Sequence, residues 1–203
     1  MIRKEIFISV DVEADGPIPG TYSMLSLGAV AINEDGVVLG EFEVNLNRLP
    51  YAREDAKTMK FWDEFPEAYQ ATRVNTVDPK IGMERFVTWF EQFQNPVFVF
   101  FPAKFDAPMV YWYLINFVER MDFMTTPDMY DIKTFAAATL KSTIYDASKA
   151  KWPKRWKNNK RRHTHVAVED AAEQGEQFIK IRNERMSQSD NDGSSFEQSL
   201  ISI

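Results

Sequence analysis

The sequence predicts an α/β protein built around one mixed β-sheet, with helices on both faces. Two apolar runs, residues 5–10 and 97–101, are rich in β-branched and aromatic side chains and have the length of buried strands. Two more strands, 24–32 and 37–44, flank an Asn-Glu-Asp-Gly turn that is typical of a hairpin. Strands joined by short turns are antiparallel, whereas strands joined through a helix are parallel, so the sheet should contain both kinds of pairing.

The remaining elements follow from helical periodicity and from the residues that interrupt it. After the first strand, residues 15–20 form a loop rich in glycine and proline. The expected helices cover residues 55–62, 66–71, 80–94, 106–120, 132–140 and 166–185. Residues 130–133 can also begin as a strand. We expect one domain over residues 1–186 and a polar, disordered tail over residues 187–203.

Composition excludes several classes of protein. The 203 residues are 44% hydrophobic and 14% aromatic, as in an ordinary globular domain. The absence of cysteine excludes disulfides, thiolate metal sites and a cysteine nucleophile. No apolar run reaches the roughly 18 residues that a membrane helix needs, and the N-terminus lacks a signal-peptide core. We therefore expect a cytoplasmic protein that does not bind membranes.

Charge is unevenly distributed along the chain. Residues 141–162, here called the basic arm, contain nine basic residues and one acid, a net charge of +8. The whole chain carries −6, so the remainder carries −14. An acidic body with one basic segment indicates a local contact with a polyanion.

The basic arm also contains aromatic residues between its cations. Trp152 and Trp156 alternate with Lys154, Arg155 and Lys157. This pattern predicts a nucleic-acid contact in which cations attract phosphates and indole rings stack on bases. The alternative is a solvated loop with two buried tryptophans.

Acidic residues follow both predicted central strands. Asp11 and Glu13 stand two residues apart at the end of the first strand, so their carboxylates point to one face. Asp106 follows the strand 97–101, and sites in open α/β sheets form at the carboxyl ends of strands. A divalent cation would relieve the repulsion among these carboxylates. The alternatives are a solvated loop for the pair and a helix N-cap for Asp106.

The third acidic motif lies at the start of the last helix. In a continuous helix a spacing of five would place His165 and Asp170 about 140° apart. If the helix starts after His165, the histidine lies on a loop and Asp170 faces inward. The alternative is that His165 only starts the helix and that Asp170 is an acid in its first turns, where the helix dipole favours a negative charge. We interpret His163 as a loop residue and Glu169 as exposed.

In order and spacing these motifs resemble the DEDDh family of 3′→5′ exonucleases, such as ribonuclease T, oligoribonuclease and proofreading exonucleases. The matching residues are Asp11, Glu13, Asp106, His165 and Asp170. The pairs Phe105-Asp106 and Asp170-Ala171 and the run Leu27-Gly28-Ala29-Val30 are also similar to family sequences. Pro102 departs from the pattern, because the family usually has asparagine at this position.

This resemblance implies a ribonuclease H-like fold with a five-stranded sheet and two divalent ions, Mg²⁺ or Mn²⁺. Asp11 would bridge the ions, Glu13 and Asp170 would complete one site, and Asp106 would support the other. Glu13 and His165 would be catalytic, with neutral His165 accepting a proton from the attacking water. The implied partner is the 3′ end of single-stranded DNA or RNA, and a homodimer is compatible with the family.

Further substrate contacts implied by the resemblance are Tyr22, Met24, Leu25 and Phe105, although core packing is an equal alternative for Met24 and Leu25. The expected reaction releases nucleoside monophosphates. Two other functions stay open, an inactive nucleic-acid-binding module of this fold and a ribonuclease H-like endonuclease.

Overall fold

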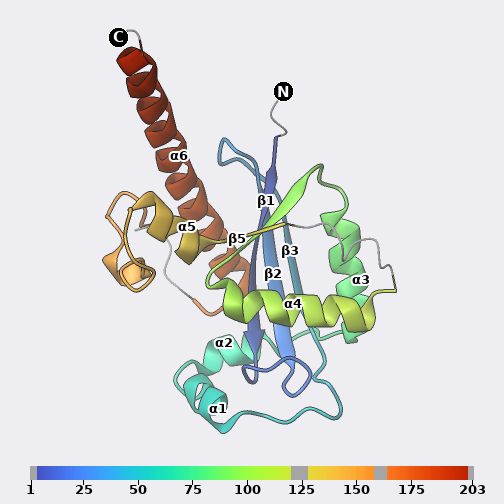
Figure 1. The fold of residues 1–203 in the computed structure, drawn as a ribbon. Helices are drawn as coiled ribbons and strands as arrows, with labels where there is room; N and C mark the ends of the chain where they lie inside the picture. Colours follow the sequence, from blue (N-terminus) through green and yellow to red (C-terminus); the bar gives the residue numbers. More distant parts are fainter. Residues whose placement is uncertain (1–3, 120–127, 158–163, 201–203) are drawn as a thin grey trace.

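The computed structural model describes residues 4–119, 128–157 and 164–200, with side chains up to residue 188 (Figure 1). The strands are β1 (Ile6–Ala14), β2 (Met24–Ile32), β3 (Val38–Asn45), β4 (Pro96–Phe100) and β5 (Met129–Asp131). The helices are α1 (Ala56–Trp62), α2 (Pro66–Ala71), α3 (Pro79–Phe90), α4 (Ala103–Phe117), α5 (Ile132–Thr139) and α6 (Ala167–Leu200), with a short 3-10 helix η2 (Lys149–Lys151).

The strands form one mixed sheet in the order β3-β2-β1-β4-β5. β1, β2 and β3 are antiparallel, because short connections join them, and β1, β4 and β5 are parallel. This arrangement confirms the predicted α/β class and its five-stranded mixed sheet. Because β1 and β4 are parallel neighbours, the chain leaves both strands at the same edge of the sheet.

Helices cover both faces of the sheet (Figure 1). Alternate residues of β1 point to opposite faces, as the pleat requires. Ile8, Val10 and Val12 pack in a core with α3 and α4, whereas Phe7 packs in a second core with α5 and α6. Asp11 and Glu13 follow the alternation of Phe7, so the chain places both carboxylates on the face covered by α6.

Two glycines allow α6 to lie directly on the sheet. A Cβ on Gly28 of β2 would come within 2.1 Å of the Val168 backbone nitrogen. On the helix side, a Cβ on Gly175 would come within 2.3 Å of the Ile32 side chain. The first turns of α6 therefore approach β2 backbone to backbone. The register also pairs Asp11 with Gly28, so this contact lies beside the acidic motif of β1.

The observed elements differ from the predicted ones at several ends. β1 continues to Ala14, four residues beyond the predicted strand 5–10, so Asp11 and Glu13 lie within the strand and not after it. α4 begins at Ala103, with Pro102 at its N-cap position, so Asp106 lies inside the first turn and is not the cap. α6 continues to Leu200 through residues for which the sequence predicts a disordered tail, since this segment lacks proline and can extend a helix that has already formed. The domain boundary at residue 186 stays a prediction. Among the described helices, none combines the length and apolarity needed to cross a bilayer.

Candidate active site

Asp11 and Glu13 lie at the carboxyl end of β1 and are almost completely enclosed. Their exposed fractions are 9% and 8%, unusually low for carboxylates. Asp106 is 3% exposed and reaches the same place from the first turn of α4. The parallel pairing of β1 and β4 brings these acids together across about 95 residues of sequence.

Asp170 completes the acidic cluster from the first turn of α6 and is 1% exposed. Its two carboxylate oxygens accept hydrogen bonds from the backbone nitrogens of Thr164 and His165, each at 3.0 Å. These bonds fix the loop before the helix. His165 itself has a φ of 58°, a left-handed conformation that is uncommon outside glycine and is often found at functional sites. As predicted, the helix starts after His165.

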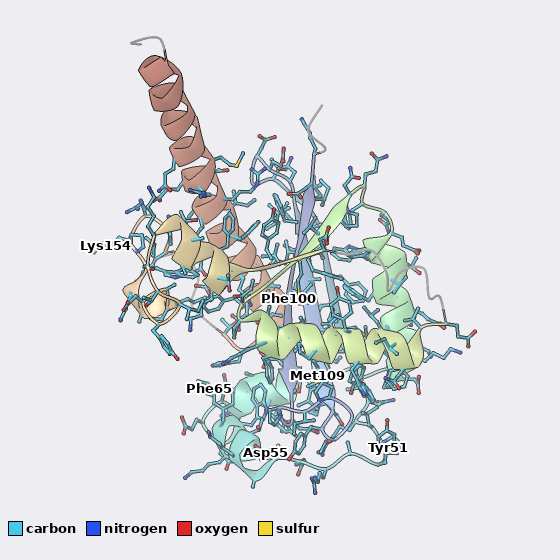
Figure 2. The ribbon with its side chains drawn as sticks, viewed as in Figure 1. Tyr51, Asp55, Phe65, Phe100, Met109 and Lys154 are labelled. Atoms are coloured by element: carbon cyan, nitrogen blue, oxygen red, sulfur yellow. The ribbon has the colours of Figure 1, made fainter. Side chains whose placement is uncertain are left out.

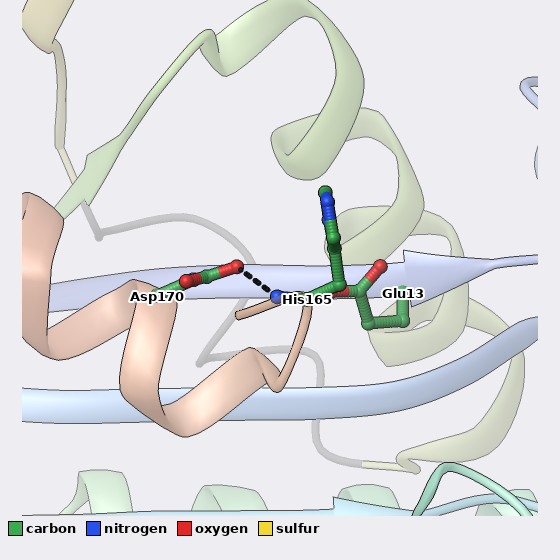
Figure 3. Close-up of side chains that lie close together, drawn as sticks. All are labelled: Glu13, His165 and Asp170. Carbon is green, nitrogen blue, oxygen red and sulfur yellow. Dashed lines mark hydrogen bonds between the residues drawn. The ribbon is translucent and has the colours of Figure 1, made fainter. Parts of the chain in front are cut away.

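The His165 ring lies against aromatic side chains of α1 and the turn that follows it. Its centroid is 4.3 Å from the Phe65 ring and 5.0 Å from the Phe61 ring, the latter edge-on. Such contacts restrict the rotation of the imidazole. Figure 3 shows His165 beside Glu13 and Asp170. His163, the other histidine, lies outside the described residues.

The electrostatics of the cluster fit divalent cations. Burial raises the pKa of Glu13 well above its usual value, and the charges of the other three carboxylates raise it further. Burial also raises the pKa of Asp106, followed by the charge of Asp11, whereas a backbone hydrogen bond at Val12 and the charge of Lys149 oppose the rise. Buried carboxylates that repel one another are suitable ligands for hard cations such as Mg²⁺ and Mn²⁺.

Three of these residues are close enough to hold one ion together. Ligand atoms of Glu13, His165 and Asp170 all lie within 4.8 Å of one another. A ring nitrogen of His165 is thus placed either to contact a cation or to contact water beside it. Geometry alone therefore leaves both roles open to the histidine.

Gln174 is a site residue that the sequence does not reveal at first reading. Its Nε2 donates a hydrogen bond of 2.6 Å to Oδ1 of Asp11, and the side chain is 2% exposed. A spacing of four places Gln174 on the same face of α6 as Asp170. This spacing could have identified Gln174 from the sequence, since a polar residue one helical turn after an inward-facing ligand must also face the site.

A cleft of about 550 Å³ opens over the acidic cluster. Asp11, Glu13, Asp106 and His165 line its polar side. Phe61, Trp62, Phe101 and Phe105 contribute apolar walls. Phe105 lines the cleft, and its contact with substrate stays a prediction, whereas the aromatic wall from α1 was not predicted.

Three other predicted substrate contacts, Tyr22, Met24 and Leu25, are absent from the described lining of the cleft. Met24 and Leu25 are completely buried in β2, because that strand is covered on both faces, and this corrects their assignment to the substrate site. Tyr22 packs against Gly16 and lies 5.9 Å below the Arg53 guanidinium.

The structure also corrects the prediction for the two tryptophans of the basic arm. Trp152 and Trp156 are 3% and 1% exposed and belong to the α5–α6 core. Their indole nitrogens donate to the Ala147 carbonyl and to the Glu184 carboxylate. Since both rings are enclosed, neither can stack on a base, and the alternative of buried tryptophans is correct.

The three cations next to these tryptophans, Lys154, Arg155 and Lys157, differ in their surroundings. Arg155 forms two hydrogen bonds of 2.6 Å with the Glu184 carboxylate, and Lys157 donates to the Ala150 carbonyl. Lys154 is exposed, and Figure 2 shows it on the arm beside α5, apart from Asp55 of the α1 segment. A phosphate contact by the arm therefore stays a prediction.

Comparisons with known proteins agree with the site. No family model matches the chain. A relative from Escherichia coli named 3′-5′ DNA exonuclease Cap18 is 33% identical over 160 residues, which cover 73% of each protein. Among solved structures, the nuclease domain of 3′hExo, a DEDDh family member bound to rAMP, has a TM-score of 0.63 at 8% identity and covers 88% of this chain and 91% of that one.

Two further structures share the fold. S. pombe Pop2p in its Mg²⁺- and Mn²⁺-bound form has a TM-score of 0.64 at 12% identity, covering 87% of this chain and 82% of that one. E. coli exonuclease I in complex with a dA16 oligonucleotide also has a TM-score of 0.64 at 12% identity, covering 88% and 41%. The acidic cluster, the ribonuclease H-like sheet and the relative of 33% identity together show that this chain belongs to the DEDDh 3′–5′ exonucleases.

Proposed function

We propose that this chain removes nucleoside monophosphates from the 3′ end of single-stranded DNA with the help of two divalent cations. The observation that carries this proposal is that three buried carboxylates from β1 and α4 line one cleft, while the buried Asp170 of α6 lies within 4.8 Å of Glu13. DNA is preferred over RNA in this proposal because the relative of 33% identity is named a DNA exonuclease.

Asp11, Glu13, Asp106 and Asp170 would hold Mg²⁺ or Mn²⁺. When bound, two such ions activate the attacking water and stabilise the leaving 3′ oxygen. The protein holds the carboxylates in place through the Thr164 and His165 backbone bonds to Asp170 and through the Gln174 bond to Asp11. These contacts order the ligands before substrate arrives.

His165 would accept the proton of the attacking water. Two contacts support this role, the backbone bond to Asp170 and the ring packing on Phe65, because together they hold the imidazole over the acidic cluster. Histidine is suitable for this task at neutral pH. A general base does not need to bind a cation, which distinguishes this role from ligation.

The cleft provides room for the terminal nucleotide. Phe61 and Phe105 line it with apolar surface, on which a base and sugar can pack, while the carboxylates lie at its polar side. A volume of about 550 Å³ is in the range of small-ligand sites.

The decisive test is degradation of matched single-stranded DNA and RNA, labelled at the 5′ end, with Mg²⁺ or Mn²⁺. We expect a ladder of shortened products, faster on DNA, and no products in a chelator. Asp11→Asn should abolish degradation, whereas Asp35→Asn, in the turn between β2 and β3, should not.

Two alternatives make different predictions in the same assay. An inactive binding module would bind the oligonucleotide and slow its migration in a native gel, but it would not shorten it with either metal ion. A ribonuclease H-like endonuclease would cut circular single strands, which a 3′–5′ exonuclease leaves intact. Homodimerisation and a cytoplasmic location stay predictions, and light scattering on the purified chain would measure the former.

A further inference from the structure

A second pocket, of about 430 Å³, lies next to the catalytic cleft. The two hollows share Phe101 and Pro102, which stand between them. The remaining wall of this second pocket includes Lys104 from α4, Lys133 from α5 and Lys149 from η2. A molecule that leaves the cleft over Phe101 and Pro102 therefore enters a pocket with three cations.

The charge of the second pocket is positive although the chain is acidic. Lys104 and Lys133 form no ion pair within the described residues, and Lys149 lies 3.5 Å from one oxygen of Glu173. Asp131 is the acid in the pocket wall, and its carboxylate accepts hydrogen bonds from the backbone nitrogens of Ala103 and Thr134.

The bonds to Asp131 hold its carboxylate against the backbone at the starts of α4 and α5. The carboxylate keeps its charge, so three lysines against one acid give the pocket wall a net charge of +2. The ammonium groups of Lys104 and Lys133 therefore remain available to an anionic ligand, and that of Lys149 is shared with Glu173. Two lysine side chains at one pocket suit phosphate groups, which carry charge on several oxygens.

Phe101 adds an aromatic surface between the two hollows. Its ring is partly exposed, and its centroid lies 5.2 Å from that of the buried Trp152 ring, in a T-shaped arrangement, and 4.9 Å from the Lys149 ammonium nitrogen. Trp152 therefore supports the ring that lies between the pockets. Proteins that bind single-stranded nucleic acid combine cations, which attract the phosphates, with aromatic rings, on which the bases stack.

We propose that the second pocket binds the phosphates of the substrate strand immediately upstream of the bond that is cut. This inference rests on the proposed function, because it assumes that the acidic cleft holds the 3′ end of a single strand. The terminal nucleotide occupies the cleft, the next base lies against Phe101, and the phosphates beyond it contact Lys104 and Lys133.

Lys149 of the basic arm lines the second pocket, so the rival path for these phosphates is the later part of the arm, around Lys154 to Lys157. Its Arg155 is bound to Glu184 through two hydrogen bonds, and its Lys157 donates to a backbone carbonyl. None of Lys154, Arg155 and Lys157 belongs to the described lining of either hollow. Lys104 and Lys133, by contrast, line the hollow that is joined to the acidic cluster through shared residues.

The test is a double variant, Lys104→Ala with Lys133→Ala, assayed on oligothymidylates of increasing length. The shortest oligonucleotide that the wild type degrades serves as the internal reference, since it has no phosphates to reach the second pocket. We expect kcat/KM on an eight-residue strand to fall on the order of tenfold, through KM, with little change on the reference. The salt slope of binding should also decrease by about 0.7 for each phosphate group that the variant can no longer neutralise.

Lys4→Ala with Lys80→Ala is the matched control, because it removes two exposed lysines that lie outside both hollows and outside the basic arm, and it should change neither substrate. Three outcomes overturn the inference: equal losses on both lengths, no loss on either, or a length-dependent loss in Lys154→Ala with Lys157→Ala and none in the pocket variant. If the wild type degrades no oligonucleotide of any length, the proposed function itself fails.

Discussion

Gln174 donates a hydrogen bond of 2.6 Å to Oδ1 of Asp11, and this bond joins the second turn of α6 to the end of β1. Both side chains are buried, with exposed fractions of 2% and 9%. A carboxylate that accepts such a bond has one oxygen oriented by the protein and keeps the other oxygen for further contacts. Gln174 is therefore a positioning residue for Asp11, acting from outside the set of carboxylates.

Replacement of Gln174 by leucine should weaken the metal site while the fold persists. Loss of a partner that orients a metal ligand typically reduces metal affinity or activity by about 10–100-fold. We expect the metal concentration for half-maximal activity to rise by a factor in this range. Gln177→Leu is the matched control, because Gln177 is equally buried on α6 but donates to Glu173. Equal effects of both variants would indicate a structural role only.

Gly28→Ala should damage the site through the backbone. The added Cβ would lie 2.1 Å from the Val168 nitrogen, so α6 must move away from β2, at a cost of about 1–3 kcal/mol. For a chain of this size we expect Tm to fall by several degrees, since 1 kcal/mol corresponds to about 2–4 °C. Activity should fall as well, because α6 carries Asp170. Thermal denaturation and the degradation assay measure the two effects.

The control for this prediction is Gly40→Ala in β3. A Cβ there would meet its nearest neighbours, the Phe93 and Trp89 rings, at 3.4 Å, which their side chains can accommodate with small shifts. We expect little change in Tm or activity. A Gly28→Ala variant as stable and active as Gly40→Ala would contradict the close approach of α6 to the sheet.

Asp106→Asn should stabilise the metal-free protein at neutral pH and abolish its activity. The folded-state pKa of Asp106 is raised, so its carboxyl favours the fold below the unfolded pKa, near 4, and loses that effect as pH rises through the folded pKa. In a chelator, the variant should therefore melt several degrees above the wild type at pH 7. This difference should disappear at acidic pH, where both side chains are uncharged.

Addition of Mg²⁺ or Mn²⁺ should reverse the order of stability at pH 7. Cations that bind only the folded protein raise its Tm, and they bind the wild type more tightly than a variant with three carboxylates. Asp63→Asn, at an exposed position after α1, is the control and should follow the wild type in both conditions. A wild type that gains no stability from either cation would argue against metal binding by the cluster.

His165→Ala separates the two roles that the geometry allows for the histidine. As a general base, His165 should contribute about 10²–10⁴-fold to the chemical step, and its loss should leave metal affinity near that of the wild type. The measurements are single-turnover rates at saturating metal and the metal-dependent rise in Tm. His163→Ala should change neither. If His165→Ala instead abolishes the metal-dependent rise, the histidine is a ligand and not the base.

Much of the fold could be predicted because its signals are local. The apolar strands, the turn at residues 33–36 and the periodic helices each depend on neighbours in sequence, and the observed elements begin and end within a few residues of the predicted ones. The end of α6 is different. Its polar residues predict a tail, whereas the structure continues the helix to Leu200, because helix growth depends on the turns already formed.

The proposed catalytic positions could be selected in the sequence because they lie near the ends of elements and match the resemblance to the DEDDh family. Asp11 and Glu13 share a strand face, and Asp170 follows a helix start, so each position has a local pattern. The contacts among these residues have no such pattern. Gln174 meets Asp11 across 163 residues, and His165 packs on Phe65 from a distant part of the chain.

The sequence by itself determined the α/β class and the mixed sheet, since these depend on periodicity and turn residues, and its resemblance to the DEDDh family supplied the five family positions. Only the tertiary structure decided which candidate substrate residues are accessible. Trp152, Trp156, Met24 and Leu25 carry side chains that suit either a base or a core, and in each case the core encloses them. The physical reason is that the burial of a side chain depends on which residues pack against it. In this chain those residues come from distant parts of the sequence, including α6 and the core that it forms with α5.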